Sequence, residues 1–191
     1  MAAAGCAGIV LAAGQSRRFG PANKLLAPLA GRPLACHAAA AMRQAAPGPL
    51  IAVVADPAVA ALFNGFVIVP PDGTDQSASL RAGIAAAVVA GASGVLLGLA
   101  DMPRIDAPHL CAVMALGRRL GAAGSSDGVR PMPPAFFAAP YFPALSLITG
   151  DRGARTLLGD LPPGALIRVP PGALADIDTP DQLTALDRDP G

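Results

Sequence analysis

The segment GIVLAAGQSRRFGPANK, residues 8–24, opens with an apolar run that no polar residue interrupts. Such runs are typical of strands covered on both faces, as in parallel sheets. Further apolar runs follow along the chain, with stretches of helical pattern between them. The runs lie at 8–12, 50–54, 66–69 and 95–100, and the helical stretches at 33–44, 58–63 and 77–90. This alternation predicts an α/β fold with a mostly parallel, Rossmann-like sheet and helices on both faces.

Length and composition favour one globular domain. The chain has 191 residues, and domains hold roughly 100 to 200 residues each. Hydrophobic residues make up 53% and charged residues 14%, so the chain can bury a large core and does not resemble a disordered segment. We therefore expect residues 1–191 to form a single domain.

Charge and aromatic content argue against nucleic acid as a partner. The formal net charge is +1, aromatic residues make up 4%, and tryptophan is absent. Nucleic-acid binding needs a basic surface or aromatic side chains on which bases stack. No nucleic-acid partner is expected.

The cysteines Cys6, Cys36 and Cys111 lie far apart and form no CxxC pair. An odd, sparse set of this kind fits reduced, buried thiols in the cytoplasm. Together with His37 and His109 they offer too few neighbouring ligands for a zinc site.

Residues 82–100 form an uncharged run long enough to span a bilayer. Alanine and glycine dominate it, and Gly91 and Gly94 divide it into an alanine-rich helix and a strand. The N-terminus is also apolar but lacks the basic segment of a signal peptide. No membrane segment is predicted, and the expected location is the cytoplasm.

The last third of the sequence carries a weaker pattern. A helix is predicted from Asp106, whose carboxylate can cap it ahead of Pro108, to Leu120. The prolines at 131, 133 and 134 indicate a rigid connection. Two further helices are predicted at 150–158 and 180–186.

The loop after the first predicted strand has the features of an anion site. Small residues, Leu11-Ala12-Ala13-Gly14, let a ligand approach the backbone, and Arg18 and Lys24 supply positive charge. The spacing matches neither GxxxxGK[ST] nor GxGxxG. An ordinary strand-to-helix turn with solvated arginines is the alternative.

Acidic residues follow another predicted strand and precede the last helix. Asp101 ends the run 95–100, at the edge of the sheet where Gly14 is expected, so both should face one cleft. A carboxylate there needs a partner or a metal. Asp176 or Asp178 can supply a second carboxylate for Mg²⁺, although Thr179-Pro180 also reads as a plain helix start.

Five sequence words together resemble the MobA-like nucleotidyltransferases, and among them the molybdenum cofactor cytidylyltransferases. The words occur in the family's order and span nearly the whole chain. They are LAAGQSRRFGPANKLL (11–26), DQSASLRAGI (75–84), LADMP (99–103), LITGDRGARTLL (147–158) and DIDTPDQL (176–183).

The resemblance implies an Mg²⁺-dependent enzyme that couples CTP to a phosphate-bearing acceptor, molybdopterin, and releases pyrophosphate. By the same resemblance, Leu11, Ala12, Ala13, Gly14, Arg18, Lys24 and Ser79 would bind the nucleotide, Arg18, Lys24 and Asp101 would be catalytic, and Asp101 and Asp178 would hold the metal. Guanylyltransferases typically read LAGG, so Ala13 favours CTP. A recipient molybdoenzyme is the implied protein partner.

Two parts of the sequence depart from the family pattern and leave the acceptor open. Met132-Pro133-Pro134 stands where cytidylyltransferases carry Gly-His-Pro, and residues 69–73 replace an Asn-Pro-aromatic stretch. Arg152 and Arg155 are candidates for the anionic acceptor, or else belong to a solvated first helical turn. Transfer to a sugar phosphate, use of GTP, and a non-catalytic nucleotide-binding accessory protein remain alternatives.

Overall fold

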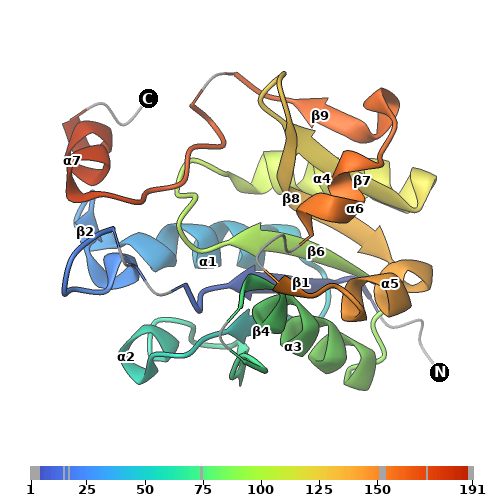
Figure 1. The fold of residues 1–191 in the computed structure, drawn as a ribbon, viewed down its shortest axis with the longest axis horizontal. Coiled ribbons are helices and arrows are strands. Elements are labelled where there is room, and N and C mark those ends of the chain that lie inside the picture. Colours follow the sequence, from blue (N-terminus) through green and yellow to red (C-terminus); the bar gives the residue numbers. More distant parts are fainter. Residues whose placement is uncertain are drawn as a thin grey trace.

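A seven-stranded sheet forms the centre of the fold (Figure 1). The computed structural model describes residues 5–14, 16, 18–73, 75–150, 154–170 and 172–188. The strands of the sheet are β1 (Ala7–Leu11), β4 (Leu50–Val53), β5 (Val67–Val69), β6 (Gly94–Leu99), β7 (Ala122–Ser126), β8 (Pro131–Ala138) and β9 (Leu166–Arg168). A small antiparallel hairpin pairs β2 (Pro28–Leu29) with β3 (Arg32–Pro33).

Helices connect these strands. The α-helices are α1 (Leu34–Ala45), α2 (Pro57–Ala60), α3 (Gln76–Val89), α4 (Ala107–Leu120), α5 (Phe142–Ser146), α6 (Arg155–Gly159) and α7 (Pro180–Arg188). Single 3-10 turns lie at η1 (Lys24–Leu26), η2 (Ala139–Tyr141) and η4 (Pro163–Ala165).

The sheet has the strand order β5-β4-β1-β6-β8-β7-β9. Strand β1 pairs in parallel with β4 and β6, and β4 pairs in parallel with β5. Strand β8 runs antiparallel to β6 and β7, and β7 pairs in parallel with β9. The carboxyl ends of all strands except β8 therefore meet at one edge, as expected for a mostly parallel α/β sheet.

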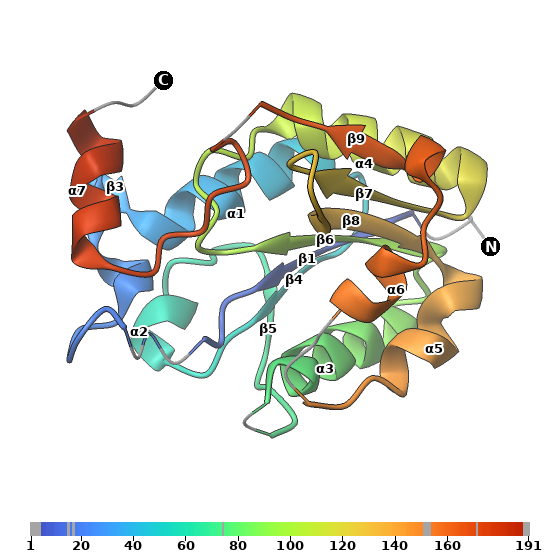
Figure 2. The same ribbon diagram turned by 45° about the horizontal axis from the view of Figure 1, so that its top comes forward.

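Helices cover both faces of the sheet (Figure 2). One apolar cluster joins α1 and α4 to the sheet, with Leu34, Met42, Leu96 and Leu110 each almost fully buried. The other cluster lies beneath α3, α5 and α6. The predicted fold class and the first four strands are confirmed, with ends shifted by a residue.

The uncharged run at 82–100 folds as the end of α3, a turn and strand β6, as the sequence predicts. Because β6 is central, its side chains are buried by helices on both faces of the sheet. Among the described residues, no helix is long and apolar enough to cross a membrane.

The prediction of a rigid connection at the three prolines is wrong, because Pro131–Ala138 is strand β8. Proline cannot donate to a ladder and is rare in central strands. Here β8 pairs with β6 only through residues 135–138, so the prolines lie beyond that ladder. The register with β7 also shifts between Gly124 and Ser125. The three prolines, which have no N–H to donate, therefore lie where β8 pairs with β7 alone or where the register with β7 shifts.

The expectation of three buried thiols is also only partly right. Cys6 is buried, Cys36 is half-buried and Cys111 is exposed. Burial raises the pKa of the Cys6 thiol to about 11, although the positive charge of Arg118 acts in the opposite direction. Cys6 is therefore a protonated, unreactive core residue at neutral pH.

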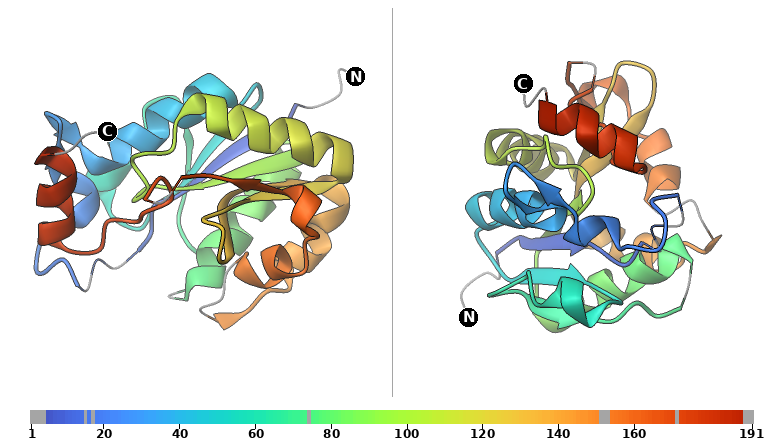
Figure 3. Two further views of the ribbon diagram at one scale, coloured as in Figure 1. Left: turned by 90° about the horizontal axis from the view of Figure 1, so that it is seen from above. Right: turned by 90° about the vertical axis from the view of Figure 1, so that its left-hand side faces the viewer.

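The C-terminal helix α7 lies beside the hairpin of β2 and β3, although about 150 residues of sequence separate them (Figure 3). The backbone N–H of Ala30 donates to the Asp187 carboxylate at 2.8 Å. This contact fixes the chain after residue 176 against the segment that carries Lys24.

Phe136 of β8 fills the space above two glycines. A Cβ on Gly117 of α4 would lie 2.3 to 2.7 Å from side-chain atoms of Phe136, and a Cβ on Gly94 of β6 would lie 2.6 Å from its ring. The helix and the strand can approach this ring only because both positions lack a side chain.

Gly117→Ala is therefore expected to lower the free energy of unfolding by about 1 to 3 kcal/mol, because the methyl group overpacks the core. Gly159→Ala is a matched helical control, since open space surrounds that position. The control is expected to be neutral or slightly stabilising. Urea unfolding measures both, and equal stabilities for the two variants would contradict this packing argument.

Candidate active site

The carboxyl edge of the sheet brings distant parts of the sequence together. The backbone N–H of Ala100, just after β6, donates to the carbonyl of Leu11 at the end of β1, at 3.0 Å. The backbone N–H of Ile177 donates to the carbonyl of Asp101 at 2.9 Å. The end of β1, Asp101 and the segment before α7 thus share one region.

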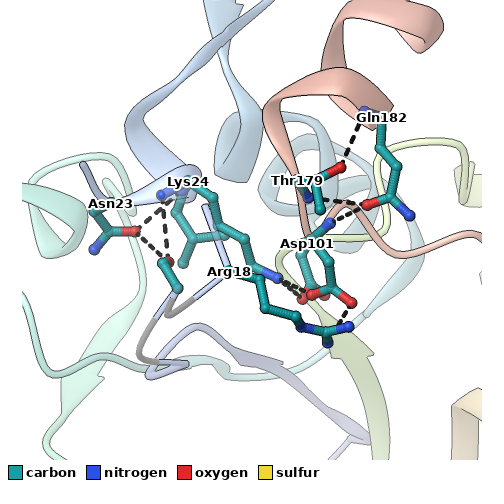
Figure 4. Close-up of polar contacts among 9 residues, drawn as sticks. Arg18, Asn23, Lys24, Asp101, Thr179 and Gln182 are labelled. Carbon is teal, nitrogen blue, oxygen red and sulfur yellow. Dashed lines mark hydrogen bonds and ion pairs between the residues drawn. The ribbon is translucent and has the colours of Figure 1, made fainter. Parts of the chain in front are cut away.

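Four charged side chains meet there, and we call Arg18, Lys24, Asp101 and Asp178 the charge cluster (Figure 4). The Lys24 Nζ lies 2.7 Å from Asp101 Oδ2 and 3.0 Å from Asp178 Oδ1. The second oxygen of Asp178 accepts from Arg18 at 2.6 Å. Two cations and two carboxylates give the cluster no net formal charge.

Lys24 is the most buried member, with 7% of its side chain exposed, against 74% for Arg18. Burial alone would lower the pKa of Lys24, because it penalises the charged form. The attraction of Asp101 and Asp178 and their hydrogen bonds outweigh burial and raise that pKa above its usual value. Lys24 therefore stays charged at neutral pH.

A set of side chains fixes the backbone of Lys24. Asn23 caps the single turn η1, and its carbonyl oxygen accepts from the N–H of Leu25 at 3.1 Å. The backbone N–H of Lys24 donates to the Ser16 hydroxyl at 3.3 Å. The Asn23 amide donates to Asp56 at 2.9 Å and holds the pKa of Asp56 below its usual range. The loop after β4 thereby anchors the turn that carries Lys24.

Asp178 owes its position to the start of α7. The Thr179 hydroxyl accepts from the N–H of Gln182 at 3.3 Å, and the Gln182 side chain accepts from the N–H groups of Asp178 and Thr179 at 2.7 and 2.9 Å. This reciprocal pattern is a capping box. The box holds the backbone of Asp178 while its carboxylate faces Lys24.

The predicted phosphate loop follows β1 closely. Ala12 is buried and donates its N–H to the carbonyl of Val53 at 2.8 Å, while Ala13 is half-buried and Gly14 exposed. Open space surrounds the position where Gly14 lacks a side chain. The backbone at Gly14 is therefore open to the approach of a ligand.

Other predicted residues lie outside the cluster. Ser79 is half-buried in the first turns of α3, and Arg155 is exposed at the start of α6. Arg152 lies outside the described residues, so of the two candidate acceptor arginines the structure describes Arg155 alone. Asp178, rather than Asp176, supplies the second carboxylate of the cluster.

The word at 75–84 has a structural role that its sequence did not reveal. Ser77 is fully buried and donates to Asp75 at 2.5 Å. Arg81 donates to the Ser77 hydroxyl at 2.8 Å and to the carbonyl of Ile148 at 3.0 Å, and Asp75 accepts from the N–H of Gly150 at 2.9 Å. The start of α3 is thereby tied to the segment that precedes α6.

Four residues that support the charge cluster were not predicted from the sequence: Ser16, Asn23, Asp56 and Gln182. The spacing Thr-x-x-Gln at 179–182 was a readable capping signal, and Asn23 before the apolar Leu25 is a favourable cap. No sequence pattern predicts the contact between Asn23 and Asp56, because only the fold brings their two loops together.

The acidic groups of the cluster could hold a divalent cation. Mg²⁺ in phosphate-transfer sites is bound by one or two carboxylates together with substrate phosphates. Asp101 and Asp178 direct oxygens at one point, within 3.0 Å of Lys24 Nζ. In the part of the chain that the structure describes, no group of three or more His, Cys, Asp or Glu side chains forms a self-sufficient metal site.

Asn23→Asp is expected to lower the melting temperature by a few degrees, because it removes a donor and sets a second carboxylate against Asp56. The double variant Asn23→Asp with Asp56→Asn restores one amide facing one carboxylate. We expect it to recover at least half of the loss in thermal melts. A double variant that melts below both single variants would show that the two side chains do not act as a pair.

Comparison with known proteins places this geometry in a family. The MobA-like NTP transferase domain matches residues 8–165. The purine catabolism protein PucB of Bacillus subtilis (strain 168) is 32% identical over 197 residues, which cover 95% of each protein.

Two solved structures of a similar protein have the same fold over nearly the whole chain. Rv0371c from Mycobacterium tuberculosis H37Rv has a TM-score of 0.84 and 28% identity, covering 99% of this chain and 100% of its own. A manganese complex of Rv0371c has a TM-score of 0.79 and 26% identity, covering 97% and 99%. The chain therefore belongs to the MobA-like NTP transferase family and is a nucleotidyltransferase with a nucleoside triphosphate as substrate.

Proposed function

We propose that this protein is a molybdenum cofactor cytidylyltransferase that uses Mg²⁺ and CTP, acts on molybdopterin and works as one domain over residues 1–191. The observation that carries the proposal is the charge cluster, in which a buried lysine and two carboxylates lie beside an open loop at the carboxyl edge of the sheet. The same edge is where ligands bind in open α/β sheets.

The proposed reaction is an in-line displacement at the α-phosphorus of CTP. An oxygen of the acceptor phosphate forms the new P–O bond, and the bond from the α-phosphorus to the bridging oxygen breaks, with pyrophosphate as the leaving group. A phosphate monoester has a second pKa of about 6 and is largely dianionic at neutral pH. The site therefore needs no general base and acts through charge neutralisation and alignment.

Lys24 and Arg18 are the proposed triphosphate ligands. Asn23 and Ser16 hold the turn that carries Lys24, and its ammonium is directed at Asp101 and Asp178 at the carboxyl edge of the sheet. Arg18 is exposed and can form paired hydrogen bonds to phosphate oxygens. The N–H groups of the Leu11–Gly14 loop would add neutral donors to the same anion.

Asp101 and Asp178 are the proposed metal ligands. Their donor set fits, because hard oxygen ligands suit Mg²⁺ or Mn²⁺ and both carboxylates already hold a cation between them. A manganese complex of the structural relative Rv0371c supports a divalent cation in this family. When bound, the cation would neutralise charge on the phosphate oxygens of the substrate.

The acceptor assignment has separate support. PucB is a purine catabolism protein, and a role related to the molybdenum cofactor fits that likeness. The proposed acceptor ligands are Arg155, exposed at the start of α6, and Arg152. A recipient molybdoenzyme is the proposed protein partner.

Transfer to another phosphate-bearing acceptor is the second candidate function, because Met132-Pro133-Pro134 differs from the family's Gly-His-Pro word.

The carboxylates provide the first test. Asp101→Asn and Asp178→Asn are expected to lower turnover about a hundredfold or more, since each removes charge stabilisation from the reacting phosphates. Asp176→Asn is the matched control and is expected to retain near-normal turnover. Pyrophosphate release measures activity, and circular dichroism confirms folding. Comparable losses for Asp176→Asn and Asp178→Asn would overturn the assignment of Asp178.

The nucleotide provides the second test. Each of the four nucleoside triphosphates is incubated with Mg²⁺ and molybdopterin, and pyrophosphate is followed. Because the Ala13 methyl group stands where a purine edge would pass, CTP is expected to exceed GTP by roughly ten to a few hundred fold in kcat/KM. Ala13→Gly should narrow that gap. A wild-type preference for GTP would exclude the cytidylyltransferase, and no pyrophosphate with any nucleotide would favour a non-catalytic nucleotide-binding protein.

A further inference from the structure

The ammonium of Lys24 occupies the point between the two proposed metal ligands. Its Nζ lies 2.7 Å from Asp101 Oδ2 and 3.0 Å from Asp178 Oδ1. A divalent cation held by the same two oxygens, at about 2.0 to 2.1 Å for Mg²⁺, would lie close to the ammonium, and the two positive charges would repel each other. Lys24 and a divalent cation therefore compete for these carboxylates.

Of the two cationic side chains in the cluster, Lys24 is the effective competitor. Arg18 is 74% exposed, and of the two carboxylates in the cluster it contacts Asp178, so its ion pair contributes little against solvent. Lys24 is 7% exposed and contacts both carboxylates. Its two ion pairs lie where water screens them least, so a metal must displace mainly Lys24.

Only the side chain of Lys24 has to move. Its backbone is held by Ser16, and the adjacent Asn23 and Leu25 form the cap of η1. The four-carbon stem of a lysine is flexible and carries a compact charge. Gly14, on the neighbouring loop, borders open space. A triphosphate there would offer the ammonium a stronger anionic partner.

We propose that Lys24 is an intramolecular competitor for the metal site, and that nucleotide binding opens the site by drawing the ammonium from Asp101 and Asp178 to the phosphates. The inference rests on the proposed function for the identity of the anion. Metal and nucleotide then bind cooperatively, because each removes an obstacle to the other. The free protein keeps its carboxylates neutralised and binds the metal weakly.

A titration with Mn²⁺ alone, followed by the electron paramagnetic resonance signal of the free ion, tests the competition without any nucleotide. Lys24→Met keeps the length of the side chain and removes the charge. It is expected to bind Mn²⁺ about tenfold or more tightly than the wild type, within the usual range of coupling between sites. Arg119→Met removes an exposed positive charge from the far end of α4 and should leave the affinity within about twofold, since water and salt screen that charge.

Equal or weaker Mn²⁺ binding by Lys24→Met would overturn the proposal. A second measurement does not depend on this variant being folded. Lys24 is the only lysine in the sequence, so acylation by an amine-reactive ester, read by peptide mass spectrometry, reports on this one side chain. Saturating Mn²⁺ should speed the acylation of Lys24 relative to the N-terminal amine in the same wild-type chain. An unchanged relative rate would contradict displacement.

CTP separates this inference from the proposed function. With CTP saturating each protein, CTP should tighten Mn²⁺ binding by a larger factor in the wild type than in Lys24→Met, where the competitor has already been removed. If Lys24→Met gains Mn²⁺ affinity but CTP has no effect on either protein, the competition stands and the proposed function fails. If CTP tightens Mn²⁺ binding equally in both proteins, the nucleotide site stands and the role of Lys24 as competitor fails.

Discussion

Placing an ammonium group in a site with little water requires anionic partners nearby, and much of this fold is arranged to supply them for Lys24. The penalty for burying a charge is large unless it is paired and hydrogen-bonded. Here one partner, Asp101, lies just after the central strand β6, and the other, Asp178, lies more than 70 residues later in the chain. The C-terminal segment therefore has to return across the sheet edge before α7 begins.

The same requirement explains why polar contacts concentrate around the cluster. Asn23 and Asp56 join the loops after β1 and β4, and the capping box of Thr179 and Gln182 fixes the approach of the last helix. In the described residues, every buried side-chain nitrogen or oxygen has a hydrogen-bond partner. These contacts fix the backbone that carries Lys24 and Asp178.

The sequence predicts those parts of the protein that depend on local pattern. Continuous apolar runs identify β1, β4 and β6, because a strand buried on both faces has no polar alternation. The run at 66–69 also identifies β5, although Val67 and Ile68 of this edge strand are exposed. Cluster residues that directly follow such runs, such as Asp101, can be placed at the sheet edge from the sequence alone. Strand β8 could not, because its prolines oppose strand formation unless the neighbouring ladders are known. The pairing of Asn23 with Asp56 likewise depends on which loops the topology brings together.

The limited pairing of β8 divides the sheet into two parts with different tolerance for change. Its ladder with β6 covers only Gly94–Leu97 opposite residues 135–138, so the first half of β8 is attached to the sheet through β7 alone. Substitutions at 131–134 disturb few bonds of the part that carries Lys24 and Asp101. Changes in the first half of β8 can therefore alter the surface there while the ladders that join β1, β4, β5 and β6 remain unchanged.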